Sequence, residues 1–213
     1  RQRRFTSDAS HELRTPLTIV YSGIELLEAE PLSNEGRTIL EDIKAETASM
    51  QYLVSDLLLL AREGQLSPKQ EVDLSSLVQK TVERFQHAYS DRVIHASIMP
   101  DLHLKGDAHQ LNRLLTVFLE NALVYSDEAI DVSLEETATE RQLTIQDHGI
   151  GIASDQQTKI FERFYRGDHS RHGTGTGLGL SIAQSIVEQH GGTISIDSTL
   201  GEGTRFIIHF PTL

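Results

Sequence analysis

Two apolar stripes in residues 1–63 limit most strongly what this chain can fold into. Within each stripe the apolar residues lie three or four positions apart, and residues 30–36, which include Pro31 and Gly36, separate the two stripes. This spacing predicts two helices, each with a narrow apolar face of the coiled-coil type. The stripe residues are Ala9, Leu13, Leu17, Val20, Ile24 and Leu27 in the first helix, and Leu40, Ile43, Thr47, Met50, Val54, Leu57 and Ala61 in the second. One hairpin cannot cover two such stripes well, so we expect a homodimer whose hairpins form a four-helix bundle.

The pattern changes after residue 66 and predicts a second domain. Residues 67–72 have no periodic apolar pattern and are interpreted as a linker. Beyond them we expect three helices: one over residues 75–89, one that begins at the cap residue Asp107 and ends at 125, and one that ends at 190. We expect strands over residues 93–98, 130–136, 142–146, 194–197 and 204–210. The expected fold class is α+β: a helical hairpin domain over residues 1–66, followed over residues 73–213 by an α/β sandwich with helices on one face of a largely antiparallel sheet.

Charge and composition exclude several classes of function. The 31 acidic residues outnumber the 19 basic ones, and the resulting net charge of −12 argues against nucleic-acid binding. The lack of cysteine excludes disulfides and thiol catalysis. No run of about 18 apolar residues is present, so no segment of this sequence is expected to cross a membrane. Because the sequence starts at Arg1 rather than Met, we expect a fragment or a processed product.

His11 is the first candidate for chemistry. It lies two positions from both Ala9 and Leu13, so a helix places it on the side opposite the apolar stripe, facing solvent. A neutral imidazole is a competent nucleophile near neutral pH, and the adjacent Glu12 carboxylate can accept the proton that it loses. Thr15 lies one helical turn further on, on the same face. The alternative, an exposed histidine without a role, is the more common case for a single histidine.

Three motifs in the second domain suit an anionic nucleotide. Asn121 lies near the end of a predicted helix, where its amide oxygen can ligate Mg²⁺ shared with phosphate oxygens. Asp147 follows a strand and can accept a hydrogen bond from an adenine amino group, while Gly149 and Gly151 admit a ligand close to the backbone. Residues 173–179, Gly-Thr-Gly-Thr-Gly-Leu-Gly, precede a helix whose free N–H groups point at phosphate. They fit neither a Walker A motif nor a Rossmann fingerprint.

Residues 5–17, Phe-Thr-Ser-Asp-Ala-Ser-His-Glu-Leu-Arg-Thr-Pro-Leu, resemble the phosphoacceptor box of sensor histidine kinases. The resemblance implies that His11 is phosphorylated, that Glu12 acts as the base, and that Thr15 positions water for dephosphorylation. The three nucleotide motifs resemble the N, G1 and G2 boxes of the GHKL (Bergerat) ATP-binding fold. Residues 160–166 resemble the F box of these kinases, and residues 201–204 resemble their last glycine motif. Together the motifs cover essentially the whole chain, in the family's order.

The resemblance also implies a set of nucleotide-binding residues and a lid. The implied cofactors are ATP and Mg²⁺, with Asn121 as the metal ligand. The residues implied to bind the nucleotide are Asn121, Tyr125, Asp147, Gly149, Gly151, Arg166, Gly175, Thr176, Gly177, Leu178, Gly179 and Thr204. The segment from 151 to 173 corresponds to the mobile ATP lid of the family. It holds the cations Lys159, Arg163, Arg166 and Arg171, which supply the local positive charge that an acidic chain needs beside phosphates.

The expected function is that of the catalytic core of a two-component sensor histidine kinase. Such a homodimer uses Mg·ATP to phosphorylate His11 and passes the phosphoryl group to an aspartate in the receiver domain of a response regulator, whose phosphate it also hydrolyses. The resemblance implies a cytoplasmic portion of a membrane-bound protein, with membrane attachment only through the missing N-terminal part. We expect the regulator to dock on the face of the bundle that continues from His11 through Thr18, Ser22 and Glu25.

Three alternatives stay open at this point. One is a GHKL ATPase of the chaperone or topoisomerase kind. Another is a degenerate kinase that acts as a nucleotide-sensing scaffold, because Val117 and Val124 stand where the N box commonly has asparagine and lysine. The third is a zinc site at His169 and His172, for which a third ligand is not evident. The sequence does not decide whether a protomer phosphorylates its own histidine or that of its partner.

Overall fold

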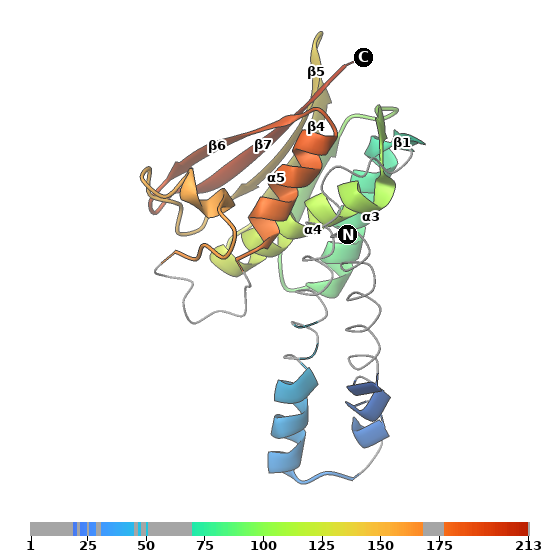
Figure 1. Cartoon of the computed structure of the whole chain (residues 1–213), viewed down its shortest axis with the longest axis vertical. Coiled ribbons are helices and arrows are strands. Elements are labelled where there is room, and N and C mark those ends of the chain that lie inside the picture. The colour runs from blue at the N-terminus through green and yellow to red at the C-terminus, as the bar shows by residue number, and fades with distance from the viewer. Residues whose placement is uncertain are drawn as a thin grey trace, which may run out of the picture.

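The computed structural model describes residues 19–20, 22–24, 26–28, 31–44, 47, 50, 70–167 and 177–212 (Figure 1). The elements from residue 70 onward are β1 (Gln70–Asp73), α3 (Leu74–Ala88), β2 (Ile94–Ile98), β3 (His103–Gly106), α4 (Ala108–Tyr125), β4 (Ile130–Glu136), β5 (Glu140–Asp147), the 3-10 helix η1 (Lys159–Phe161), α5 (Gly179–Gln189), β6 (Thr193–Thr199) and β7 (Gly203–Pro211). The α/β sandwich expected from the sequence is confirmed, and the three long helices and five long strands lie where their patterns predict them.

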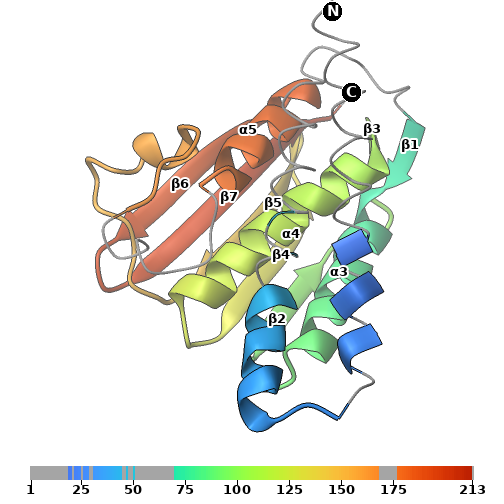
Figure 2. The same cartoon turned by 60° about the horizontal axis from the view of Figure 1, so that its bottom comes forward.

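One five-stranded sheet organises this sandwich. Its strand order is β2-β4-β5-β7-β6, with β2 and β4 parallel and every other neighbouring pair antiparallel. Helices α4 and α5 run across the same face of the sheet, which both views show (Figure 1, Figure 2). The apolar residues of the helices and of the inward-facing strand positions form a single buried cluster. Burying each large apolar side chain contributes about 1.5–3 kcal/mol to folding, so this layer supplies most of the stability.

Cross-strand register sets the inward-facing side chains in rows. Ile145 pairs with Phe206 in β7, and Phe206 pairs with Ile196 in β6. Because side chains alternate between the two faces of a strand, residues two positions further along face the same helices. The row after Ile145, Phe206 and Ile196 is polar: Asp147 pairs with Thr204, and Thr204 pairs with Ser198. The apolar core therefore ends in a row of polar side chains at one edge of the sandwich.

A small second sheet was not expected from the sequence. Strands β1 and β3 pair antiparallel, with Gln70 opposite Gly106 and Asp73 opposite His103. Residues 70–72, which the sequence suggested as part of a linker, therefore form a strand of the catalytic half of the chain. In β1 only Val72 is buried, and it joins the core cluster. A four-residue strand with a single buried side chain leaves no alternating pattern to recognise.

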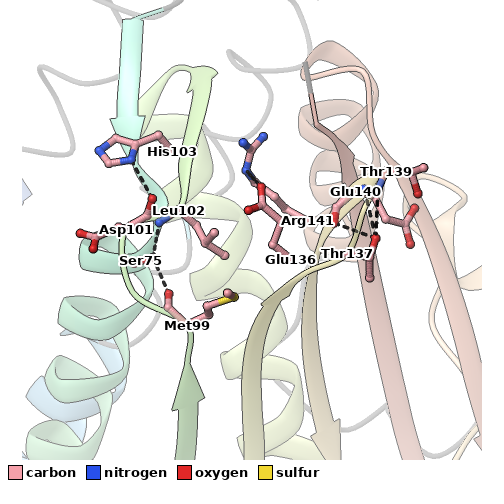
Figure 3. Close-up of polar contacts among 10 residues, drawn as sticks. All are labelled: Ser75, Met99, Asp101, Leu102, His103, Glu136, Thr137, Thr139, Glu140 and Arg141. Atoms are coloured by element: carbon pink, nitrogen blue, oxygen red, sulfur yellow. Dashed lines mark hydrogen bonds and ion pairs between the residues drawn. The ribbon is translucent and has the colours of Figure 1, made fainter.

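Hydrogen bonds fix the turns at the end of the sandwich that Figure 3 draws. The Ser75 hydroxyl donates to the carbonyl of Met99 at 2.6 Å and accepts from the backbone N–H of Leu102 at 3.0 Å. It thereby ties the β2–β3 connection to the first turn of α3. On the neighbouring β4–β5 hairpin, the Thr137 hydroxyl donates to the carbonyl of Glu140 at 3.1 Å. Both contacts satisfy backbone groups outside the sheet ladders.

The described parts of the helical hairpin fit the two-stripe pattern. Residues 34–44 are helical, and the ion pair between Lys44 and Glu28 joins this helix to the preceding helical segment. The stripe residues Ile24, Leu40 and Thr47 are buried within the hairpin. Other stripe residues remain 44–48% exposed in the single chain: Val20, Leu27, Ile43 and Met50. Among the described residues, no helix combines the length and the apolar character needed to cross a membrane.

Candidate functional site

Asp147 lies at the centre of the candidate site, in the polar row that ends the core. Its side chain follows Leu143 and Ile145 on the inward face of β5 and is only 6% exposed as a residue. The Oδ1 atom accepts hydrogen bonds from the backbone N–H of Gly149 at 2.9 Å and of Thr204 at 3.3 Å. Among the described residues, the hydrogen bonds to this carboxylate all use Oδ1, so Oδ2 keeps its capacity to accept from a ligand.

The buried environment of Asp147 disfavours the charged form of its carboxyl group. Burial raises the pKa of the Asp147 carboxyl above its ordinary value, because water no longer solvates the anion. The two backbone hydrogen bonds and the nearby His148 oppose this shift of the pKa. His148 itself contacts Asp131 through Nε2 at 2.9 Å on the edge of the site. A buried carboxyl with an unused acceptor is typical of a group that recognises a donor on a ligand.

The glycines after Asp147 are required by packing within the protein. A Cβ atom at Gly149 would lie 1.9 Å from the carbonyl oxygen of Tyr125. Gly151 has a φ of +68°, and a Cβ there would lie 2.0 Å from the carbonyl oxygen of Thr199. The sequence suggested that these glycines admit a ligand, whereas the structure shows that they let this turn pack against the end of α4 and the end of β6. The Ile150 N–H donates to the Tyr125 carbonyl at 3.2 Å and completes that contact.

Helix α4 brings Asn121 and Tyr125 to the same edge of the sandwich. The helix begins at the Asp107 side chain, which accepts from the N–H groups of His109 and Gln110 at 2.9 and 3.2 Å. Asn121 is half-buried near its last turn. The neighbouring Glu120 lies 3.9 Å from Arg113 on the same helix. The carbonyl end of α4 lies beside the turn that carries Asp147, and Asn121 lies about one helical turn before that end.

Val117 is one of the two departures from the usual N box, and the structure gives it a packing role. It is 3% exposed and belongs to the core cluster. A Cβ at Gly179 would lie 3.3 Å from Cγ1 of Val117, so Val117 holds the first residue of α5 against α4. Val124, the second departure, is 69% exposed. Val117 therefore takes part in the contact between α4 and α5, whereas Val124 puts an apolar side chain at a surface position where the usual N box has a cation.

The start of α5 provides the phosphate end of the candidate site. Leu178 is buried and precedes the helix, whose first N–H groups have no partner within the helix. Gly177 has a φ of +71°, and its carbonyl accepts from the N–H of Phe164 at 2.9 Å. This hydrogen bond joins the segment after η1 to the residues that immediately precede α5. Arg166 is half-buried close to that junction.

The structure brings together most of the site residues that it describes, through three direct contacts. The Asp147 turn contacts the end of α4 at Tyr125, Asp147 accepts from Thr204, and α4 contacts α5 at Gly179. His11, Glu12, Thr15, Gly175 and Thr176 lie outside the described residues, as do His169 and His172. Ser198 and Gln157 were not among the residues predicted from the sequence: the Ser198 hydroxyl contacts that of Thr204, and the Gln157 amide, in the lid segment, donates to the Ser198 carbonyl. The available signal for Ser198 was a polar residue at the inward position that follows Ile194 and Ile196.

Comparisons with known proteins identify two families along the chain. The model of the His Kinase A (phospho-acceptor) domain matches residues 1–66. The model of the histidine kinase-, DNA gyrase B- and HSP90-like ATPases matches residues 106–213.

Relatives with both parts are sensor histidine kinases. Sensor histidine kinase YkoH of Bacillus subtilis is 34% identical over 99% of this chain and 48% of its own length. The signal transduction histidine-protein kinase/phosphatase MprB of Mycolicibacterium smegmatis is 35% identical over 95% of this chain and 43% of its own length. Among solved structures, full-length ShkA in complex with AMPPNP matches with a TM-score of 0.80 at 27% identity, over 98% of this chain and 45% of that one. The chain spans about half the length of the curated relatives that it matches. It belongs to the sensor histidine kinases of two-component systems, with a phosphoacceptor part followed by an ATPase domain of the type shared with DNA gyrase B and HSP90.

Proposed function

We propose that this chain is the catalytic core of an ATP-dependent protein histidine kinase that phosphorylates His11 and transfers the phosphoryl group to an aspartate of a response regulator. The observation that carries the proposal is the buried Asp147 carboxyl, whose Oδ2 can accept a hydrogen bond beside the start of α5. A nucleotide bound between these two features has its adenine amino group at Asp147 and its phosphates at the helix N-terminus. Phosphoryl transfer then needs mainly positioning and charge neutralisation.

Magnesium fits the donor set at the end of α4. Mg²⁺ in kinases is usually held by one or two protein oxygens together with substrate phosphates and water. Asn121 offers one amide oxygen, and among the described residues no cluster of three acidic, histidine or cysteine side chains forms a separate metal site. Asn121 is therefore proposed as a shared ligand of Mg²⁺ bound to ATP. Bound there, the ion neutralises charge on the phosphates.

The remaining nucleotide contacts follow from the G2 box and the lid. We assign Gly175, Thr176, Gly177, Leu178 and Gly179 to the phosphates, and Tyr125, Gly149, Gly151 and Thr204 to the base and sugar end. Arg166 and the other lid cations offset the repulsion between an acidic chain and a polyphosphate. Val117 does not remove a capacity for catalysis in this arrangement, because its side chain lies in the contact between α4 and α5.

The phosphoacceptor part is proposed to work as a homodimer over residues 1–66. The half-exposed stripe residues Val20, Leu27, Ile43 and Met50 are the surface that a second copy would cover. Because β1 pairs with β3, residues 70–72 are proposed to belong to the catalytic domain, which leaves residues 67–69 as the proposed linker. The response regulator is proposed to dock on the outer face that includes Thr18, Ser22 and Glu25, of which Ser22 is exposed in the structure. The expected membrane attachment stays a prediction.

Incubation with radiolabelled ATP and Mg²⁺ tests the proposed function. The chain should acquire a label that is stable to base and labile to acid, as a phosphohistidine is. His11→Gln should abolish the label and keep ATP binding, whereas His95→Gln, at an exposed histidine of β2, should keep both. ATP hydrolysis without a phosphoprotein would favour an ATPase of the gyrase or chaperone kind. Nucleotide binding without either reaction would favour a scaffold.

A further inference from the structure

Ser198 lies at the centre of a hydrogen-bond network next to the candidate base site. Its Oγ accepts from the backbone N–H of Ile152 at 2.8 Å and donates to the carbonyl of Gly203 at 2.9 Å. The hydroxyl oxygen of Thr204 lies 2.9 Å from the same Oγ. The Gln157 amide also donates to the backbone carbonyls of Ser198 at 2.9 Å and Ile152 at 3.2 Å, which fixes the position of both backbone segments.

The number of hydrogens in this network determines the direction of the Thr204 hydroxyl. A serine hydroxyl has one hydrogen to donate and two lone pairs to accept with. With the Ser198 hydrogen on the Gly203 carbonyl, the contact to Thr204 is a hydrogen bond only if Thr204 donates. All three contacts of Ser198 are then satisfied. The opposite direction gives up the bond to Gly203 and leaves one Ser198 lone pair unused.

Thr204 stands between Ser198 and Asp147 in the polar row. It pairs with Asp147 across β5 and β7 and with Ser198 across β6 and β7. Its own backbone N–H donates to Asp147 Oδ1 at 3.3 Å. Thr204 is 5% exposed and Asp147 is 6% exposed, so bulk water does not compete for either side chain. The Thr204 hydroxyl therefore lies in the polar row between Ser198 and Asp147, and its lone pairs are not used by the contact with Ser198.

We propose that Ser198 is a positioning residue for base selection: by taking the hydrogen of the Thr204 hydroxyl, it makes that hydroxyl, like the neighbouring Asp147 carboxylate, act toward the base as a hydrogen-bond acceptor. The inference rests on the proposed nucleotide-binding function. A site lined by the acceptors of Asp147 and Thr204 favours a purine with an exocyclic amino group, as in adenine. It disfavours a purine with a carbonyl at that ring position, because two acceptors then face each other. Without Ser198, the Thr204 hydroxyl can rotate and donate to such a carbonyl.

Calorimetric titration of the 213-residue chain with ATP and with inosine triphosphate, both with Mg²⁺, tests this inference. The two nucleotides differ in the base, where inosine carries a carbonyl in place of the adenine amino group. The ratio of the two dissociation constants should favour ATP in the unsubstituted chain. Ser198→Ala should reduce this ratio by about tenfold, the effect of one hydrogen bond. Ser198→Thr keeps a hydroxyl and should restore the ratio, and Ser195→Ala, at an exposed serine of the same strand, should leave it unchanged.

A second set of variants shows whether Ser198 acts through Thr204. In a Thr204→Val chain the hydroxyl is gone, so Ser198→Ala should cause no further change in the ratio. An equal loss of affinity for both nucleotides in Ser198→Ala, or an unchanged ratio, would overturn the inference and leave the proposed function intact. Failure of the unsubstituted chain to bind either nucleotide would overturn both. If circular dichroism shows that Ser198→Ala does not fold, Ser198→Cys replaces it with a side chain of similar size.

Discussion

At the scale of single residues, Asp147 illustrates how a proposed binding group lowers stability by being buried. Its carboxyl lies at a position where the strand pattern would otherwise place an apolar side chain, after Leu143 and Ile145. Burial raises its pKa, so the folded chain holds this proton up to a higher pH than the unfolded chain does. The contribution of Asp147 to stability therefore falls as the pH rises from its ordinary pKa of 3.8 through the raised value.

Asp147→Asn should separate binding from stability. The asparagine Oδ1 can still accept from the N–H groups of Gly149 and Thr204, but its amide opposes the adenine amino group with a donor. We expect ATP binding to weaken by about 1.5–3 kcal/mol, while the Tm at neutral pH stays equal or rises. The difference in Tm between variant and parent should shrink as the pH falls toward 4. Calorimetry measures the ATP affinity, and thermal melts at two pH values measure the difference in Tm. Asp197→Asn, at the surface, is the control. A lower Tm for the variant at neutral pH would contradict it.

At the scale of elements, the turns at the end of the sandwich opposite Asp147 stabilise it away from the proposed nucleotide site. The Ser75 hydroxyl forms hydrogen bonds with two backbone groups of the β2–β3 connection (Figure 3). It thus differs from Ser198, which also bonds two backbone groups but contacts a side chain of the site.

Ser75→Ala should lower stability and spare nucleotide binding. The buried N–H of Leu102 would lose its partner, which costs about 1–3 kcal/mol. The loss should appear as a lower midpoint in urea unfolding with an unchanged m-value, and the dissociation constant for ATP should stay the same. Ser76→Ala, one residue along α3, is the matched control, because Ser76 donates its cap hydrogen bond to Asp73 through its backbone N–H, which the substitution keeps. Equal weakening of ATP binding in Ser75→Ala would mean that this end of the sandwich is coupled to the site.

The same elements show what the sequence can predict. Helices α3, α4 and α5 and strands β4, β5 and β7 repeat apolar residues over enough positions for their periods to be recognised. Strands β1 and β3 have four residues each, so their pairing depends on a tertiary contact that no local pattern reveals. Asp147 was found because its motif is local. The role proposed for Ser198 was not, because it requires the register of β6 and β7 with β5, which lies far from them in sequence. The function of Gly149 in packing likewise depends on where α4 ends.

At the scale of the whole molecule, the hairpin leaves an apolar surface that one chain does not cover. The full chain of 23.8 kDa should therefore sediment as a dimer at micromolar concentration. Ile43→Glu, on the half-exposed part of the second stripe, should shift it toward the monomer because a charge would be buried in the interface. Leu200→Glu, at an exposed apolar residue of the catalytic domain, should leave the dimer intact. A monomeric parent chain would refute the proposed bundle.

We also expect dephosphorylation of the regulator to depend on the assembled molecule. Thr15→Ala should keep autophosphorylation of His11 and slow the hydrolysis of the regulator's phosphoaspartate, because orienting a water needs the hydroxyl whereas the imidazole attack does not. The release of phosphate from a phosphorylated receiver domain, measured beside the autophosphorylation rate, tests this. Thr38→Ala, at an exposed position of the other helix, is the control. Equal loss of both rates would mean that Thr15 only supports the helix near Pro16.

The antiparallel pairing of β1 with β3 also has a mechanical consequence. The linker enters at Gln70, whose partner Gly106 leads directly into Asp107, the cap of the helix that carries Asn121. A force applied through Gln70 and Gly106 therefore acts on the same end of the strand pair. A pull from the bundle breaks the hydrogen bonds between β1 and β3 one after another, starting at this end, instead of loading all of them at the same time. We therefore expect this strand pair to open under such a pull before α4 or the five-stranded sheet is strained.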